Sequence, residues 1–248
     1  MKFSENSLFV APTPVKLAEE LAGWFYSQVF NHSNASKQYY IALSGGTTPV
    51  LFFNYLASYY GAYIDWSRIH FFWADERCVS PDHNDSNYKT AFVNFLSKIE
   101  IPSSQIHRIR GEEDPAQEAV RYAEEIKAIV PAEENIPRFD LILLGMGSDG
   151  HTASLFPQQA ESYVGGDGLV TATVNPVTQQ PRVTLTPRLI NNAAKVVFQV
   201  TGFAKASIVA EILQQKPEAA KYSASKIKPH HGDLYWFIDA GAAKELFR

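Results

Sequence analysis

The chain has 248 residues, of which 46% are hydrophobic and 13% aromatic, and it carries a formal net charge of −4. This composition is sufficient for a large buried core, and the 19% share of charged residues is not that of a disordered chain. The charge balance provides no general attraction for nucleic acid. The single cysteine, Cys78, excludes an internal disulfide and a cysteine-based zinc cluster.

The N-terminal segment gives no sign of a targeting sequence. Residues 1–6 are polar, and the apolar run that follows covers only 8–10, so no signal peptide is predicted. No uninterrupted apolar run approaches the ~18 residues that a membrane span needs. We therefore expect a cytoplasmic protein that binds neither nucleic acid nor membrane, and that is a monomer or a weak homo-oligomer.

Predicted helices and strands alternate along the chain. Some segments have apolar residues at helical spacing, whereas others are short continuous apolar runs that are typical of strands buried on both faces. Thr13 is a suitable N-cap, as are Thr48 before Pro49 and either Asp85 or Ser86. The predicted elements, in chain order, are a helix over 14–30, a strand over 39–43, a helix over 50–60, a strand over 69–73, a polar loop over 74–85, a helix from its end to about 98, a short strand over 106–109, a helix over 115–130, strands over 139–144, 169–174, 183–185 and 195–201, a helix over 203–214, a strand over 234–238, and a short terminal helix capped by Asp239.

This alternation predicts an α/β fold, with a mostly parallel sheet covered by helices on both faces. The chain contains no internal repeat, no low-complexity tract and no linker rich in proline, glycine or serine. The glycine-rich stretch 165–168 is too short to separate two domains. We therefore predict one domain over 1–248, in which polar residues that follow the strands meet at one edge of the sheet.

The first candidate site is the turn Ser44-Gly45-Gly46-Thr47-Thr48-Pro49, between a predicted strand and a predicted helix. Two glycines allow backbone N–H groups to approach a ligand, and the N-terminus of the following helix favours negative charge. A turn that only connects the strand to the helix explains the same residues, so both interpretations stay open at this point. The Gly-Lys-Ser/Thr of a Walker loop is absent.

The second candidate site follows the strand over 69–73, where Asp75, Glu76 and Arg77 are consecutive. The planar guanidinium of Arg77 is suited to a phosphate group. Asp75 could act as a base or hold Arg77 in position. The acidic residues and histidine within 82–85 raise the alternative of a metal site, but a solvated polar loop explains them equally well, and we predict no metal.

The third candidate site is the segment 139–157, which contains a buried strand and the pattern G-x-G-x-x-G. A dinucleotide site is disfavoured, because Asp149 would put a carboxylate beside the pyrophosphate and Pro157 leaves little room for the long helix of that motif. His151 is suited to general base catalysis, since its unperturbed pKa is about 6.5. Asp149 could orient the ring of His151 or raise its pKa. A histidine that only bonds to the backbone of a turn is the alternative.

The fourth candidate site consists of two late cations, Arg182 and Lys205. Lys205 follows Gly202 and is predicted to lie one turn into the helix over 203–214. From there its ammonium group would reach the same edge of the sheet. A solvated surface lysine is the alternative.

Taken together, these stretches resemble the family of 6-phosphogluconolactonases and glucosamine-6-phosphate isomerases. The similar segments occur in the family's order over most of the chain, at 43–49, 73–77, 85–88, 144–157 and 202–206. The resemblance implies a three-layer α/β/α sandwich with a Rossmann-like core, and no cofactor. It implies hydrolysis of 6-phospho-D-glucono-1,5-lactone to 6-phospho-D-gluconate, the second step of the oxidative pentose phosphate pathway.

The same resemblance suggests a role for each candidate residue. His151 becomes the catalytic base, with Asp149 beside it. The residues implied for binding the sugar-phosphate substrate are Ser44, Gly45, Gly46, Asp75, Arg77, Arg182 and Lys205.

The two branches of this family need different chemistry. Isomerisation with loss of ammonia requires additional acid/base groups, and the deaminases, as the family pattern goes, carry a glutamate five residues after the loop histidine. Here that position is Phe156, and a phenyl ring cannot transfer a proton. The resemblance therefore favours lactone hydrolysis. The alternatives are the deaminase reaction and a non-catalytic sugar-phosphate-binding module, which would not need His151.

Overall fold

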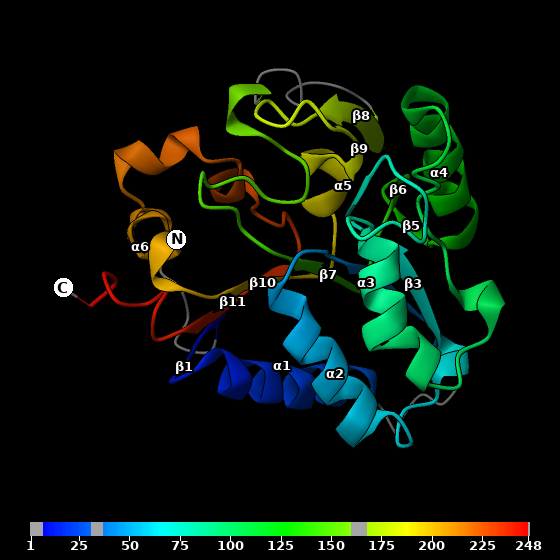
Figure 1. Ribbon diagram of the computed structural model, residues 1–248, viewed down its shortest axis with the longest axis horizontal. Helices are drawn as coiled ribbons and strands as arrows, with labels where there is room; N and C mark the ends of the chain where they lie inside the picture. Colours follow the sequence, from blue (N-terminus) through cyan, green and yellow to red (C-terminus); the bar gives the residue numbers. More distant parts are fainter. Residues whose placement is uncertain (1–6, 31–36, 160–167, 248) are drawn as a thin grey trace.

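The structure is a computed structural model that describes residues 7–30, 37–159 and 168–247. Its centre is a six-stranded sheet with the order β1-β11-β10-β7-β2-β3, in which every pair of neighbours is parallel (Figure 1). The strands of this sheet are β1 (Leu8–Ala11), β2 (Tyr39–Leu43), β3 (Ile69–Trp73), β7 (Leu141–Leu144), β10 (Lys195–Val200) and β11 (Asp233–Asp239). The predicted parallel sheet is confirmed.

Helices lie on both faces of this sheet. In Figure 1, α1 and α2 lie below the sheet, whereas α4, α5 and α6 lie above it. The helices are α1 (Pro14–Val29), α2 (Thr48–Tyr60), α3 (Asn87–Asn94), α4 (Pro115–Ile129), α5 (Pro187–Ile190) and α6 (Ala206–Leu213). The predicted α/β/α sandwich is confirmed. None of the helices in the described ranges is long and apolar enough to cross a membrane.

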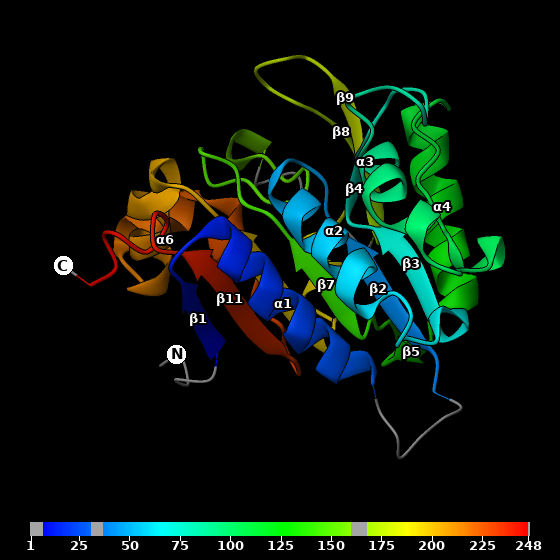
Figure 2. The same cartoon turned by 60° about the horizontal axis from the view of Figure 1, so that its bottom comes forward.

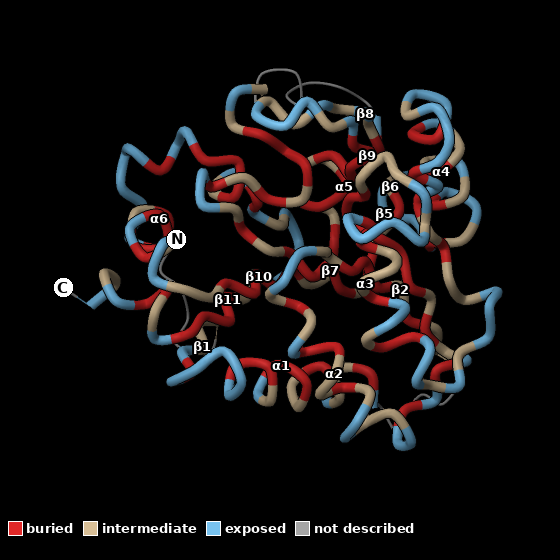
Figure 3. The backbone as a smooth tube through the Cα atoms, viewed as in Figure 1, coloured by how far each residue is buried: buried red, intermediate tan, exposed pale blue. Residues whose placement is uncertain are grey.

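The sheet forms the buried centre of the molecule (Figure 3). All four residues of β7 are buried, as expected for a parallel strand that is covered on both faces. In α1, the buried residues Leu17, Leu21 and Phe25 recur at helical spacing and face the core. Thr13 caps this helix as predicted, because its side chain accepts the Lys16 N–H.

The order of the strands opens a crevice at the carboxyl edge of the sheet. β3 lies on one side of β2, whereas β7, β10 and β11 lie on the other side, so the strand order reverses between β2 and β7 (Figure 2). The register pairs Ala42 of β2 with Ile142 of β7 and with Phe72 of β3. The loops after these strands therefore emerge side by side at the place where open α/β sheets bind ligands.

A second sheet, of three antiparallel strands, was not predicted. Its order is β4-β9-β8, and it includes part of the segment that the sequence predicted to be a polar loop over 74–85. That prediction was wrong at its start, because pairing with β9 turns three charged residues into a strand. The remaining strands are β4 (Asp75–Arg77), β5 (Ala132–Glu133), β6 (Ile136–Pro137), β8 (Val170–Val174) and β9 (Pro181–Leu185).

The strand prediction also missed β1 and placed a strand over 106–109 that the structure does not contain. β1 was not predicted, since its run of four residues becomes an edge strand only by pairing with β11. The strand predicted over 106–109 is wrong, because this segment makes a single bridge from Ile106 to Phe71. The glycine-rich stretch 165–167 lies outside the described residues, and the assignment of 1–248 to one domain stays a prediction.

Helix ends differ from the sequence prediction by a few residues. Thr47, rather than Thr48, occupies the N-cap of α2, and its side chain makes no capping bond to the described residues. Ser86 caps α3, which ends at Asn94, before the predicted end near 98. Turns follow Asp239 in place of the predicted terminal helix.

The buried carboxylate of Glu76 joins β4 to α3. The side chain of Glu76 is almost inaccessible to solvent, and this burial raises its pKa. The hydrogen bonds that the carboxylate accepts from backbone N–H groups oppose this shift. The donors, at 2.7–3.1 Å, are the backbone N–H groups of Arg77, Asn87 and Tyr88 and the hydroxyl of Ser86. Glu76 therefore fixes the relative positions of Arg77 and Asn87.

We expect Glu76→Gln to lower the free energy of unfolding by roughly 2 kcal/mol, because the new amide group turns a donor toward buried N–H groups. For a chain of this size, this corresponds to a fall in Tm of roughly 4–8 °C, measured by thermal denaturation. Glu124→Gln is the matched control, since it removes an exposed ion pair with Lys127 on α4 and should leave Tm nearly unchanged. Equal Tm values for the two variants would contradict the role of Glu76.

Candidate active site

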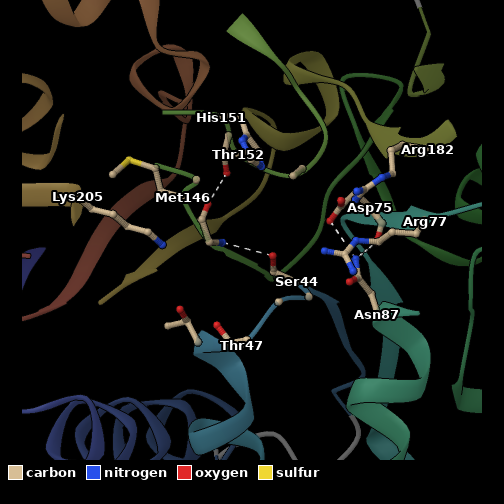
Figure 4. Close-up of a pocket in the computed structure, with 16 residues that line it drawn as sticks. Ser44, Thr47, Asp75, Arg77, Asn87, Met146, His151, Thr152, Arg182 and Lys205 are labelled. Carbon is tan, nitrogen blue, oxygen red and sulfur yellow. Dashed lines mark hydrogen bonds between the residues drawn. The ribbon is translucent and has the colours of Figure 1, made fainter. Parts of the chain in front are cut away.

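A cleft lies at the carboxyl edge of the sheet, between the loops that follow β2 and β7 (Figure 4). The two loops touch where Ser44 Oγ accepts the N–H of Gly145 at 3.3 Å. Asp149 does not line the cleft but contacts His151, which does. The predicted site residues that line the cleft are Ser44, Gly45, Gly46, Asp75, Arg77, His151, Arg182 and Lys205.

The turn after β2 is shaped by two glycines. Gly46 has a φ of +90°, and the space beside it is open. A Cβ atom at Gly45 would lie 1.8 Å from Oδ1 of Asn87, so only glycine allows the two segments to come this close. The Thr47 side chain makes no bond that caps α2, and Thr47 and Thr48 at the start of this helix line the cleft. This arrangement is suited to an anion.

Two arginines form one wall of the cleft. Arg77 of β4 lies directly opposite Arg182 of β9 in the antiparallel register. The hydrogen bonds of their guanidinium groups go to neutral groups: Arg77 donates to the Asp85 carbonyl at 2.5 Å, and Arg182 donates to the Gln180 side chain at 2.8 Å. The Nε of each has no partner among the described residues. Burial, together with the like charge of Arg77, lowers the pKa of Arg182.

Lys205 reaches the cleft from the other side. Figure 4 shows its side chain extending toward the cleft opposite Arg77 and Arg182. Lys205 closes a 3₁₀ turn over 203–205, and α6 begins only at the next residue, so the prediction that it lies one turn into the helix was wrong. Burial lowers the pKa of Lys205, and the charge of Asp239 only partly opposes this shift.

Asp75 supports the cleft from beneath. Its side chain is 5% exposed, and Oδ2 accepts the hydroxyl of Ser154 at 2.7 Å. The amide of Asn87 donates to the Asp75 carbonyl at 2.9 Å and lies 3.4 Å from Oδ1. The carboxylate therefore contacts Ser154 and Asn87 rather than Arg77, and it connects the loop that carries His151 to α3.

His151 and Asp149 form a hydrogen-bonded pair. Nδ1 of His151 lies 2.5 Å from Oδ1 of Asp149, which also accepts the backbone N–H of His151 at 3.1 Å. Burial opposes ionisation of Asp149, but the hydrogen bond and the charge of His151 outweigh it and lower the pKa of Asp149. Since an ionised carboxylate can only accept, Nδ1 is the donor of this bond, and Nε2 is the nitrogen that can act as a base when the ring is neutral. No side chain of the described ranges bonds to Nε2.

The imidazole of His151 packs directly against the backbone of Gly147. A Cβ atom at Gly147 would lie 2.3 Å from the His151 ring, and the Gly147 N–H donates to the His151 carbonyl at 2.8 Å. Phe156, where the deaminases carry glutamate, packs its ring 5.1 Å from the imidazole. The side chain of His151 is 31% exposed, so water can reach it.

The sequence assigned no individual role to eight other described residues that line the cleft, although all of them lie in the segments quoted above. Asn87 follows the cap of a helix, and nothing in its local pattern indicates that it would face the turn after β2. The two threonines after Gly46 belong to the first candidate site. These further lining residues are Thr47, Thr48, Asn87, Gly145, Met146, Gly147, Thr152 and Ala153. Within the described parts of the chain, no three histidine, cysteine or acidic side chains are grouped for a metal ion.

Comparison with known proteins identifies the class to which this fold and cleft belong. Residues 12–236 match the family model described as glucosamine-6-phosphate isomerases/6-phosphogluconolactonase. The 6-phosphogluconolactonase of Haemophilus influenzae is 40% identical over 93% of this chain and 94% of its own length. That of a Synechocystis strain is 43% identical over 83% of this chain and 84% of its own. The chain therefore belongs to the glucosamine-6-phosphate isomerase/6-phosphogluconolactonase family.

Solved structures show the same architecture. The crystal structure of a devB protein is 38% identical, has a TM-score of 0.89, and covers 96% of this chain and 98% of its own. The 6-phosphogluconolactonase of Trypanosoma brucei is 28% identical with a TM-score of 0.83, and the coverage is 97% and 98%. A monomeric glucosamine-6-phosphate deaminase, 18% identical with a TM-score of 0.81, shares the fold alone; it covers 96% of this chain and 99% of its own.

The lowered pKa of Lys205 predicts proton uptake when an anion binds. Where the pH approaches this lowered pKa, a fraction of the free protein holds a neutral amine, and a bound phosphate dianion raises the pKa again, so the complex takes up a proton. The affinity should therefore fall as pH rises through the lowered pKa. Calorimetry of inorganic phosphate binding in buffers of different ionisation enthalpy measures this uptake.

The variant Lys205→Met should abolish this proton uptake and weaken phosphate binding. The exposed Lys216→Met, which changes the net charge equally, is the control and should retain both. Proton uptake that persists in Lys205→Met would show that another group titrates.

Proposed function

We propose that this protein hydrolyses 6-phospho-D-glucono-1,5-lactone to 6-phospho-D-gluconate, the second step of the oxidative pentose phosphate pathway. The observation that carries the proposal is the pairing of His151 with Asp149, which leaves Nε2 as an accessible base in a cleft with cationic walls. Relatives named 6-phosphogluconolactonase support it, since they are about 40% identical over most of the chain. Water is the second reactant, and the reaction requires no cofactor.

The cationic groups of the cleft bind the substrate's phosphate. The turn over 44–46 provides backbone N–H groups and the N-terminus of α2, and Arg77 and Lys205 add charge from opposite sides, with Arg182 behind Arg77. Since no carboxylate of the described residues pairs with these cations, an anion restores their charge balance. This binding energy acts away from the bond that breaks, and it orients the lactone ring toward His151.

His151 activates the water molecule. Nε2 accepts a proton as the water oxygen attacks C1 of the lactone, and Asp149 stabilises the imidazolium that forms. The bond from C1 to the ring oxygen then breaks, and the imidazolium returns the proton to the departing oxygen.

The deaminase reaction is the second candidate, and the position of Phe156 argues against it. The ring of Phe156 is 2% exposed and packs against the imidazole, so no carboxylate is available there for the additional proton transfers. A binding module would need the cations but not a base with an oriented ring.

A cytoplasmic location and a monomeric or weakly oligomeric state remain part of this proposal.

A coupled assay tests the reaction. Freshly generated 6-phosphogluconolactone should be hydrolysed well above its spontaneous rate, with glucosamine 6-phosphate as the negative comparison. Activity on glucosamine 6-phosphate alone would identify the deaminase reaction. Binding of 6-phosphogluconate without turnover of either compound would identify a binding module.

His151→Ala should lower kcat by about 100-fold or more, because it removes the general base while leaving the phosphate site intact. The exposed His231→Ala, which lies outside the cleft, should retain the full rate. Spontaneous hydrolysis is subtracted in both assays. A change within a few-fold for His151→Ala would exclude this residue as the base.

A further inference from the structure

The loop that carries His151 is anchored on three sides. At its start, the N–H of Gly145 bonds to Ser44, and near its end Ser154 bonds to Asp75; both partners line the cleft. The third anchor is the segment 222–224, which follows the 3₁₀ turn Pro217–Lys221 after α6 and does not line the cleft. The mechanism above assigns no role to this segment.

Ser223 and its neighbour hold two carbonyl groups of the loop. Ser223 is 4% exposed, and its hydroxyl donates to the carbonyl of Leu155 and lies 3.5 Å from that of Gly150. The backbone N–H of Ala224 donates to the same Gly150 carbonyl at 3.1 Å. Gly150 directly precedes His151, so the Ala224 N–H holds the peptide that carries the imidazole, and the Ser223 hydroxyl holds the same loop at Leu155.

Tyr222 connects the same peptide to α6. Gly150 has a φ of +80°, and a Cβ atom there would lie 2.2 Å from the ring of Tyr222, so the glycine and the buried ring are closely packed. The hydroxyl of Tyr222 donates to Oε2 of Glu211 on α6 at 2.9 Å. This helix directly follows Lys205. The side chain of Tyr222 therefore links the loop that carries His151 to α6, the helix that follows Lys205.

We propose that Ser223 and Tyr222 are positioning residues for His151, in a proposal that rests on the lactonase function above. Ser223 acts by holding the loop at the Leu155 carbonyl, and Tyr222 acts by packing against Gly150; neither residue touches the substrate. Small displacements of a catalytic group reduce the rate strongly, since the reacting atoms must be aligned. Loss of this support should therefore lower kcat while KM stays nearly unchanged.

The test compares Ser223→Ala with Ser225→Ala. Ser225 lies in the same turn, and its hydroxyl bonds to the Tyr222 carbonyl at 2.8 Å without contacting the loop of His151. We expect Ser223→Ala to lower kcat by roughly 10-fold. Its KM and its affinity for inorganic phosphate should stay within about twofold of the wild-type values. Equal kcat values for the two variants would overturn the proposal.

Coupling to His151 separates positioning from a general loss of stability. In the His151→Ala background, Ser223→Ala should cause no further loss of rate, since it acts only through the imidazole. A second full loss in that background would contradict the proposal. If Ser223→Ala does not fold, Tyr222→Phe decides, because it keeps the ring and removes the hydroxyl that interacts with Glu211 and Lys221. A full kcat in this variant would overturn the proposal.

Failure of the underlying function gives a different result. A wild-type protein without hydrolysis above the spontaneous rate would overturn both proposals. A wild-type protein that is active, with Ser223→Ala equal to Ser225→Ala, would overturn only the positioning role.

Discussion

The reversal of strand order between β2 and β7 is the constraint on which the rest of the structure depends. Parallel strands with aligned register send their following loops to one edge of the sheet, and a reversal leaves two of these loops without a helix between them. The turn after β2 and the loop after β7 meet there, with Ser44 bonded to Gly145. Residues about a hundred positions apart in the chain thereby share one cleft.

Two cationic side chains of the cleft differ from Arg121 on α4 in the direction in which their pKa values are shifted. On α4, Arg121 pairs with Glu118 and Glu125, and strong hydrogen bonds from these carboxylates raise its pKa. In the cleft, burial lowers the pKa values of Arg182 and Lys205, and nearby carboxylates such as Asp75 and Asp239 oppose these shifts only in part. Burying a cation without a paired carboxylate is unfavourable. The cleft is therefore suited to an anion.

Close contacts at three glycines shape the cleft and the loop that carries His151. Gly45 accommodates the Asn87 amide, Gly147 accommodates the imidazole of His151, and Gly150 accommodates the ring of Tyr222. In each case a Cβ atom would overlap a side chain from another segment or from the loop itself. The glycines that suggested a phosphate turn and a nucleotide motif thus serve packing as well as backbone freedom.

The sequence by itself determined the parallel sheet, the order of its main helices and strands, and the residue types of the cleft, because apolar periodicity and continuous apolar runs are local properties. It also identified His151, Arg77 and Lys205 through short motifs. Only the tertiary structure decided that Asp75–Arg77 is a strand, since this depends on pairing with β9. Long-range packing likewise placed Asn87 beside Gly45 and Tyr222 behind Gly150, contacts between distant segments that no local pattern encodes.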